Sequence, residues 1–162
     1  MAEFYSTLDV TRYTAIRHSN IYGPYDKYDL DHSHVFGATV TKIMTAKDKI
    51  VVWGKGLEKR DFLHVDDLVD FVDLAISIQK TPFEIYCCGS GAGVSINQLV
   101  KTMTRCSGRN VIVEHDLTKP TIPVEIVLDC SKAKSVLNWT PKVDLEKGIE
   151  RTFAWWKKNI SK

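Results

Sequence analysis

The stretch from Phe83 to Cys88 restricts the possible folds more than any other part of the sequence. Its residues, Phe-Glu-Ile-Tyr-Cys-Cys, show almost no alternation of polar and apolar side chains. Such a pattern is typical of a strand that is buried on both faces, as in a parallel sheet. A glycine run from Gly89 to Gly93 and a predicted helix from Ser95 to about Cys106 come next. A strand, a glycine turn and a helix in this order favour an α/β fold.

Strands and helices also alternate along the rest of the chain. Apolar residues three, four and seven positions apart predict helices, and runs of β-branched residues predict strands. Strands are expected at 13–17, 50–53, 62–65, 111–114 and 125–129, and helices at 33–46, 66–80, 133–138 and 144–159, with weak helical character at 4–12. No internal repeat or flexible linker divides the sequence, so residues 1–162 are predicted to form one unit.

The segment from Trp53 to Asp67 combines several structural signals. It reads Trp-Gly-Lys-Gly-Leu-Glu-Lys-Arg-Asp-Phe-Leu-His-Val-Asp-Asp. Gly54 and Gly56 tolerate positive φ, which tight turns between strands require. We therefore interpret the segment as a hairpin that leads into a helix. Asp66 is the predicted N-cap, because its side-chain oxygen suits the free N–H groups of a helix start.

Two side chains of this predicted hairpin could recognise a nucleotide. Trp53 offers a flat π surface, and Arg60 offers a planar fork of donors that matches phosphate oxygens. On adjacent strands the two residues would suit a nucleotide. The simpler alternative is that Trp53 belongs to the core and that Arg60 is an exposed charge.

The glycine run also has two interpretations. A loop between a strand and a helix is where phosphate binds in nucleotide-binding folds. However, Gly89-Ser-Gly91-Ala-Gly93 does not match the Gly-x-Gly-x-x-Gly fingerprint. We favour a tight turn, because a lone glycine-rich motif is weak evidence for a ligand.

His32 and His34 lie close in sequence to Asp29 and Asp31. A metal site is conceivable there, but no further cysteine or histidine completes a tetrahedral set, so we predict none. A sharper hypothesis makes His34 a proton donor or acceptor, because histidine titrates near neutral pH. Alternatively, His34 caps the helix that follows it.

The composition argues against several classes of protein. A formal net charge of +2 over 162 residues does not indicate binding to nucleic acid or to a membrane surface. No apolar run reaches the roughly 18 residues of a membrane span. The first six residues do not resemble a secretory signal. The four cysteines, at 87, 88, 106 and 130, form no Cys-x-x-Cys pair and are expected to be reduced, which favours a cytoplasmic protein.

Four motifs along the chain resemble those of the NAD(P)-dependent nucleotide-sugar epimerase/dehydratase family, the extended short-chain dehydrogenases. They are Arg17-His-Ser-Asn-Ile-Tyr-Gly-Pro24, Trp53-Gly-Lys-Gly56 with Arg60-Asp-Phe-Leu-His-Val-Asp-Asp-Leu68, Tyr86-Cys-Cys-Gly-Ser-Gly91 with Ser95-Ile96, and the segment 129–141. The resemblance covers nearly the whole chain. It implies the substrate-binding C-terminal part of such an enzyme, with the last strands of a Rossmann sheet.

Within this family the chain most resembles enzymes that epimerise and reduce a GDP-keto-sugar with NADPH. The resemblance implies that His18, Ser19, Asn20 and Ile21 border the nicotinamide of NADP or NAD. It implies that His34 lies at the cofactor and transfers a proton during epimerisation. It also implies that Lys42, Trp53 and Arg60 hold the nucleotide-sugar, for which a GDP-sugar is favoured.

The 162 residues lack two elements of that family. They contain neither the Gly-rich dinucleotide fingerprint nor the Tyr-x-x-x-Lys catalytic pair. We therefore expect the N-terminal dinucleotide-binding half to be absent from this chain. We also expect the chain to bind no cofactor and to have no turnover by itself.

Several alternatives stay open at this point. The chain could derive from another nucleotide-sugar 4-epimerase or 4,6-dehydratase of the family. It could also be a non-catalytic nucleotide-sugar binding module that pairs with a separate N-terminal half, or only a stable folding fragment. Strands near Ile16 and Ile85 would expose edges and faces in each case, which predicts self-association through that surface.

Overall fold

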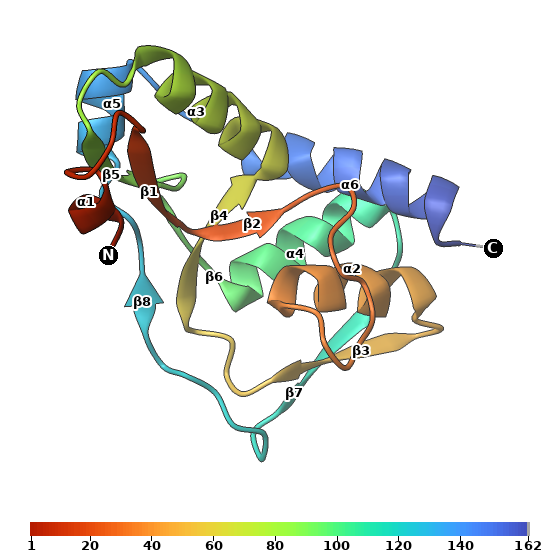
Figure 1. Ribbon diagram of the computed structural model, residues 1–162. Coiled ribbons are helices and arrows are strands. Elements are labelled where there is room, and N and C mark those ends of the chain that lie inside the picture. The colour runs from red at the N-terminus through yellow and green to blue at the C-terminus, as the bar shows by residue number, and fades with distance from the viewer. Residues whose placement is uncertain (162) are drawn as a thin grey trace.

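The computed structural model describes residues 1–161 and confirms the α/β class (Figure 1). The helices are α1 (Ala2–Tyr5), α2 (Val35–Thr45), α3 (Val65–Ile78), α4 (Ile96–Ser107), α5 (Ser131–Leu137) and α6 (Leu145–Asn159). The strands are β1 (Tyr13–His18), β2 (Asn20–Tyr22), β3 (Lys49–Trp53), β4 (Lys59–His64), β5 (Phe83–Cys88), β6 (Gly93–Ser95), β7 (Ile112–Asp116) and β8 (Glu125–Ile126).

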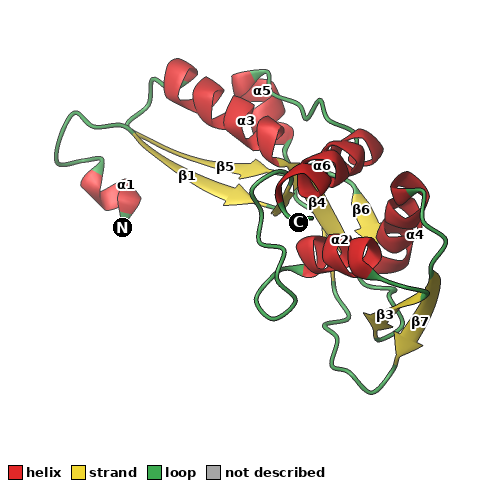
Figure 2. Cartoon of the chain, turned by 90° about the vertical axis from the view of Figure 1, so that its right-hand side faces the viewer, coloured by secondary structure: helices red, strands yellow, loops and turns green. Residues whose placement is uncertain are grey.

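Strands β1 and β5 form a parallel pair, as the sequence predicted. Helices α3 and α5 lie over one face of this pair (Figure 2). The side chains buried beneath them form the sheet cluster, made of Leu63, Phe71, Ala75, Tyr86, Cys88, Ala133, Leu137 and Trp139. Burial of β5 on both faces was predicted and is wrong, because Ile85 in the middle of this strand is 36% exposed.

Helices α2, α4 and α6 enclose a second core beside strands β2 and β4. We call it the helical cluster, and its central members are Tyr22, Phe36, Val40, Ile43, Leu99, Met103, Ile149 and Phe153. The rings of Tyr22 and Phe36 stack with centroids 4.1 Å apart. Strand β4 joins the two cores, because Phe62 belongs to the helical cluster and Leu63 to the sheet cluster.

The predicted hairpin between β3 and β4 is wrong. Strand β3 pairs in parallel with β7, whereas β4 pairs with β2, β6 and β8. Gly54 and Gly56 do adopt positive φ, at 67° and 65°. However, their backbone groups bond to distant segments: the N–H of Gly54 donates to Asp116, and the carbonyl of Gly56 accepts from Asn97. The segment between β3 and β4 therefore directs the two strands to different partners and does not close a hairpin.

Several predicted helix ends are confirmed. Ser95 and Gln98 form a reciprocal capping box on α4. Asn138 ends α5 in the left-handed conformation, and Asp144 caps α6. The cap predicted for α3 is wrong, because β4 runs directly into the helix. His64 holds the N-cap position, and its Nδ1 accepts from the backbone N–H of Asp66.

Within residues 1–161, no helix combines the length and the apolar character that a membrane crossing requires. The four cysteines are free thiols, and only Cys88 is fully buried.

Candidate functional site

Two clefts lie on either side of Val35, at the start of α2, and Val35 lines both. The first, the Trp53 cleft, has a volume of about 500 Å³. Its walls come from α2, β3, the start of α4 and the connector 117–124 between β7 and β8, and include Thr39, Lys42, Trp53, Ile96, Thr121 and Ile122. Two of the three predicted substrate-binding residues thus lie together here.

Trp53 lies at the end of β3 and its side chain is 53% exposed, so the alternative that places it in the core is wrong. The ammonium groups of Lys42 and Lys119 lie 5.9 Å and 5.6 Å from its ring centroid. Both distances allow cation–π attraction. The Nζ of Lys42 also donates to the carbonyl of Val51 at 2.9 Å, and burial lowers the pKa of Lys42. The site therefore combines a ring with two cations, which suits an aromatic anion.

Arg60 acts on this cleft through the connector. It does not line the cleft directly. Its guanidinium donates to the carbonyl oxygens of Val124 at 2.8 Å and Ile122 at 3.3 Å. Because Ile122 forms part of the cleft wall, Arg60 holds that wall in place.

The second cleft, the His34 cleft, has a volume of about 540 Å³. His18, Ser19, Asn20, Ile21 and His34 all line it, so the structure brings together every residue predicted to border a cofactor. The side chain of Asn20 donates to the backbone carbonyl of Asp61 at 2.9 Å, which ties β2 to β4. The Oγ of Ser19 is buried and has no hydrogen-bond partner among the described residues.

His34 holds the N-cap position of α2, but its side chain makes no cap hydrogen bond. The capping alternative is therefore wrong, and the imidazole is exposed at the cleft. His32 instead pairs with Asp29, with Nδ1 and Oδ1 3.0 Å apart. Among residues 1–161, the compact group of possible metal-donor atoms is Cys106, Glu146 and Glu150, and it includes neither histidine.

The glycine run is organised by a buried carboxylate. Asp61 is 0% exposed and accepts hydrogen bonds from the backbone N–H groups of Ser90 and Gly91, at 2.7 Å and 3.1 Å. It also accepts from the backbone N–H of Leu128 at 3.2 Å. These donors are the ones that a phosphate would need, so the tight-turn interpretation is the better one. Sequence reasoning missed the role of Asp61.

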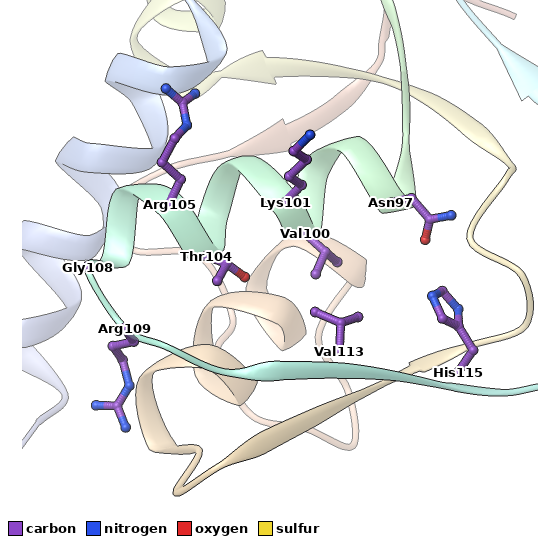
Figure 3. Close-up of a pocket in the computed structure, with 9 residues that line it drawn as sticks. All are labelled: Asn97, Val100, Lys101, Thr104, Arg105, Gly108, Arg109, Val113 and His115. Carbon is purple, nitrogen blue, oxygen red and sulfur yellow. The ribbon is translucent and has the colours of Figure 1, made fainter.

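A third cleft, of about 510 Å³, lies between α4 and β7 (Figure 3). Val100 and Val113 point toward each other across it, whereas Arg105 and Arg109 point away. Arg105 pairs with Glu146 on α6, and Arg109 donates to the carbonyl of Ala46. Its arginine charges are therefore not directed at a ligand, and we do not include this cleft in the site.

Two residues that line the clefts, Val35 and Tyr25, and one beside the Trp53 ring, Lys119, were not predicted from the sequence. Val35 and Lys119 carry no local signal, because their positions depend on how distant segments pack. Tyr25 has a positive φ of 69°, although it is not a glycine. Only the turn signal of the preceding Gly23-Pro24 pointed to unusual backbone there.

The family model named "NAD dependent epimerase/dehydratase family" matches residues 1–89, which is more than half of the chain. The chain belongs to this family. Its members' nicotinamide cofactor agrees with the expected cofactor class.

Curated relatives from this family include GDP-L-fucose synthase 1 of Arabidopsis thaliana, which is 36% identical over 88% of the chain. The UDP-glucuronate 4-epimerase of Thermodesulfobacterium geofontis is 31% identical over 91% of the chain. The chain spans only 45% and 44% of these two proteins. It therefore corresponds to less than half of each relative's length.

Among solved structures, the UDP-glucose 4-epimerase of Thermotoga maritima with UDP-glucose superposes with a TM-score of 0.85 at 28% identity. The match covers 98% of the chain and 50% of that structure. The expected fold, the C-terminal part of an extended short-chain dehydrogenase, is thereby confirmed.

Proposed function

We propose that residues 1–162 act as one nucleotide-sugar-binding unit of an NAD(P)-dependent epimerase/reductase of the GDP-L-fucose synthase type. The observation that carries this proposal is the pair of ammonium groups, Lys42 and Lys119, beside the exposed ring of Trp53. A nucleoside diphosphate matches this arrangement, because its base can stack on the ring while its phosphates attract the cations.

The sugar then extends from the Trp53 cleft toward the His34 cleft. The two clefts share Val35, so a ligand that fills the first can reach the second past that side chain. This direction brings the sugar carbons near the exposed imidazole of His34. There His34 would donate or accept the proton that epimerisation requires.

The residues at 18–21 fit a nicotinamide. Within residues 1–161 the buried Oγ of Ser19 has no hydrogen-bond partner, and burying an unpaired polar group is unfavourable, so an amide from the cofactor would satisfy it. His18, Asn20 and Ile21 complete the wall beside it. NADP or NAD would supply the hydride when bound, and we favour NADP.

The chain should nevertheless show no turnover by itself. Its 162 residues contain no dinucleotide fingerprint and no Tyr-x-x-x-Lys pair to act as the acid and base. We expect the chain not to oxidise NADPH when GDP-4-keto-6-deoxymannose is added. The absorbance of the reduced nicotinamide measures this. Measurable turnover in a pure sample would contradict this.

Calorimetric titration with GDP, UDP, CDP and dTDP tests nucleotide binding directly. We expect one nucleotide to bind and Trp53→Ala to weaken it, since stacking a base on an aromatic ring is worth about 1–3 kcal/mol. Lys49→Ala is the matched control, because Lys49 lies on the same strand but pairs with Glu114 outside the cleft. Failure of all four nucleotides to bind would overturn the proposal.

The same titration separates GDP-sugar enzymes from the alternatives in the family. Preference for UDP or dTDP would instead favour a 4-epimerase or 4,6-dehydratase, which the likeness to UDP-sugar epimerases keeps open. Arg60→Ala should weaken binding about tenfold or more if Arg60 leaves the connector for a phosphate. An unchanged affinity would assign Arg60 to the cleft wall alone.

A further inference from the structure

Tyr25 has a strained backbone at the rim of the His34 cleft. Its φ of 69° lies in the left-handed region, which a side chain with a Cβ rarely adopts. Within residues 1–161, Tyr25 and Asn138 are the only non-glycine residues with positive φ. Asn138 is a helix terminus, where asparagine is well suited to this conformation. Tyr25 has no such explanation, and strain of this kind concentrates at functional sites.

The surrounding structure holds Tyr25 in this conformation. The hydroxyl of Tyr28 donates to the carbonyl of Gly23 at 2.6 Å, which closes the loop around Tyr25. The carbonyl of Tyr28 in turn accepts from Thr41 on α2. The ring of Tyr25 lies against Trp155 of α6, with centroids 4.9 Å apart. These hydrogen bonds hold the loop, and the contact with Trp155 positions the ring of Tyr25.

The ring of Tyr25 is largely exposed to solvent. Tyr25 is 86% exposed, and its hydroxyl makes no hydrogen bond to the described residues. It lines the His34 cleft together with His34 and Asp26. At this exposure the ring gains little burial from its contact with Trp155, so packing alone does not account for its strained position.

We infer that Tyr25 is a sugar-positioning residue whose ring packs on the C–H face of the hexose in the His34 cleft. This inference rests on the proposed function, which brings a nucleotide-sugar past Val35 into this cleft. The C–H face of a pyranose is apolar, so it loses contact with water when it packs on an aromatic ring. Tyr25 would thereby orient the sugar carbons toward His34.

Saturation-transfer NMR of the chain with GDP-fucose tests this, because it reports separately on base and hexose protons. In the wild type both sets of protons should receive saturation. Tyr25→Asn removes the ring but tolerates the left-handed backbone, so it should lose the hexose signals and keep the base signals. Tyr25→Phe keeps the ring and should retain both. Tyr5→Asn, an exposed tyrosine of α1 outside the cleft, is the control and should also retain both.

The outcomes separate the two proposals. Hexose signals that persist in Tyr25→Asn would overturn the role of Tyr25 and leave nucleotide binding intact. Loss of base and hexose signals together in Tyr25→Asn would also overturn it, because the residue would then support the cleft as a whole. Absence of any signal in the wild type would overturn both proposals. The thermal midpoint of Tyr25→Asn should not fall below that of the wild type, since the substitution relieves strain; a clear fall would indicate a structural role instead.

Discussion

The helical cluster and the sheet cluster differ in how fully the surrounding elements enclose them. Helices α2, α4 and α6 enclose the helical cluster, and Ile43, Leu99 and Ile149 at its centre are 0% exposed. Helices α3 and α5 cover one face of the sheet cluster, whereas the other face is incompletely covered and leaves Ile85 exposed. The two clefts with exposed candidate site residues thus lie beside the enclosed core, whereas the sheet keeps an exposed apolar face.

The largest expected effect on stability comes from a substitution of Asp61, which lies on β4, the strand that contributes to both clusters. Asp61→Asn replaces a buried acceptor of several hydrogen bonds with a group that also donates, which leaves N–H groups of the glycine run unpaired. We expect a loss of about 3 kcal/mol in the free energy of unfolding, measured with urea. Asp70→Asn is the control, because its exposed pair with Lys142 should contribute less than about 1 kcal/mol. Equal losses in the two variants would contradict the assigned role of Asp61.

Hydrogen exchange should show the difference between the clusters directly. Amides in α4 and α6 should exchange only through global unfolding. Amides in β1, at the open edge of a two-stranded sheet, should exchange through local opening that needs on the order of 2 kcal/mol less. Mass spectrometry of deuterated peptides measures both. Equal protection would mean that the sheet cluster is as well supported as the helical one.

Self-association should depend on the open sheet. We expect dimers or larger species in sedimentation at high concentration, because exposed strand edges and apolar side chains pair with other chains. Ile85→Lys should shift the chain toward monomer. Ile112→Lys, at a 65% exposed position on β7, should not. A wild-type chain that stays monomeric throughout would refute this surface as a self-association site.

The smallest expected effect concerns pH at the junction of β4 and α3. Burial lowers the pKa of His64 below 6.5, although nearby Asp66 opposes the shift. The unfolded chain therefore binds the proton more readily, so the stability from His64 is present above pH 6.5 and is lost as the pH falls toward the folded-state pKa. Thermal midpoints between pH 7.5 and 5.5 should fall less in His64→Asn, which keeps a capping residue but does not titrate. If the thermal midpoints of the wild type and His64→Asn fell equally with pH, this prediction would be contradicted.

Short-range chemistry accounts for what the sequence predicted correctly. The helix boundaries predicted at Ser95, Asn138 and Asp144 are each set by contacts among neighbours within a few positions. The resemblance to a family also brought His18 to Ile21 and His34 together as one group, and the structure places them on one cleft. Their roles in binding and catalysis remain predictions for the experiments above.

The pattern of residues along the chain thus determined the α/β class, most helices and the parallel pairing of the strand at Phe83–Cys88. Three features were decided by the tertiary structure alone. Strand β3 pairs with β7 and not with β4, Asp61 accepts hydrogen bonds from the glycine run, and the ammonium of Lys119 lies beside the ring of Trp53. The physical reason is sequence separation. Helix and cap preferences depend on residues a few positions apart, whereas strand partners and cleft walls are chosen by packing between segments that lie tens of residues apart.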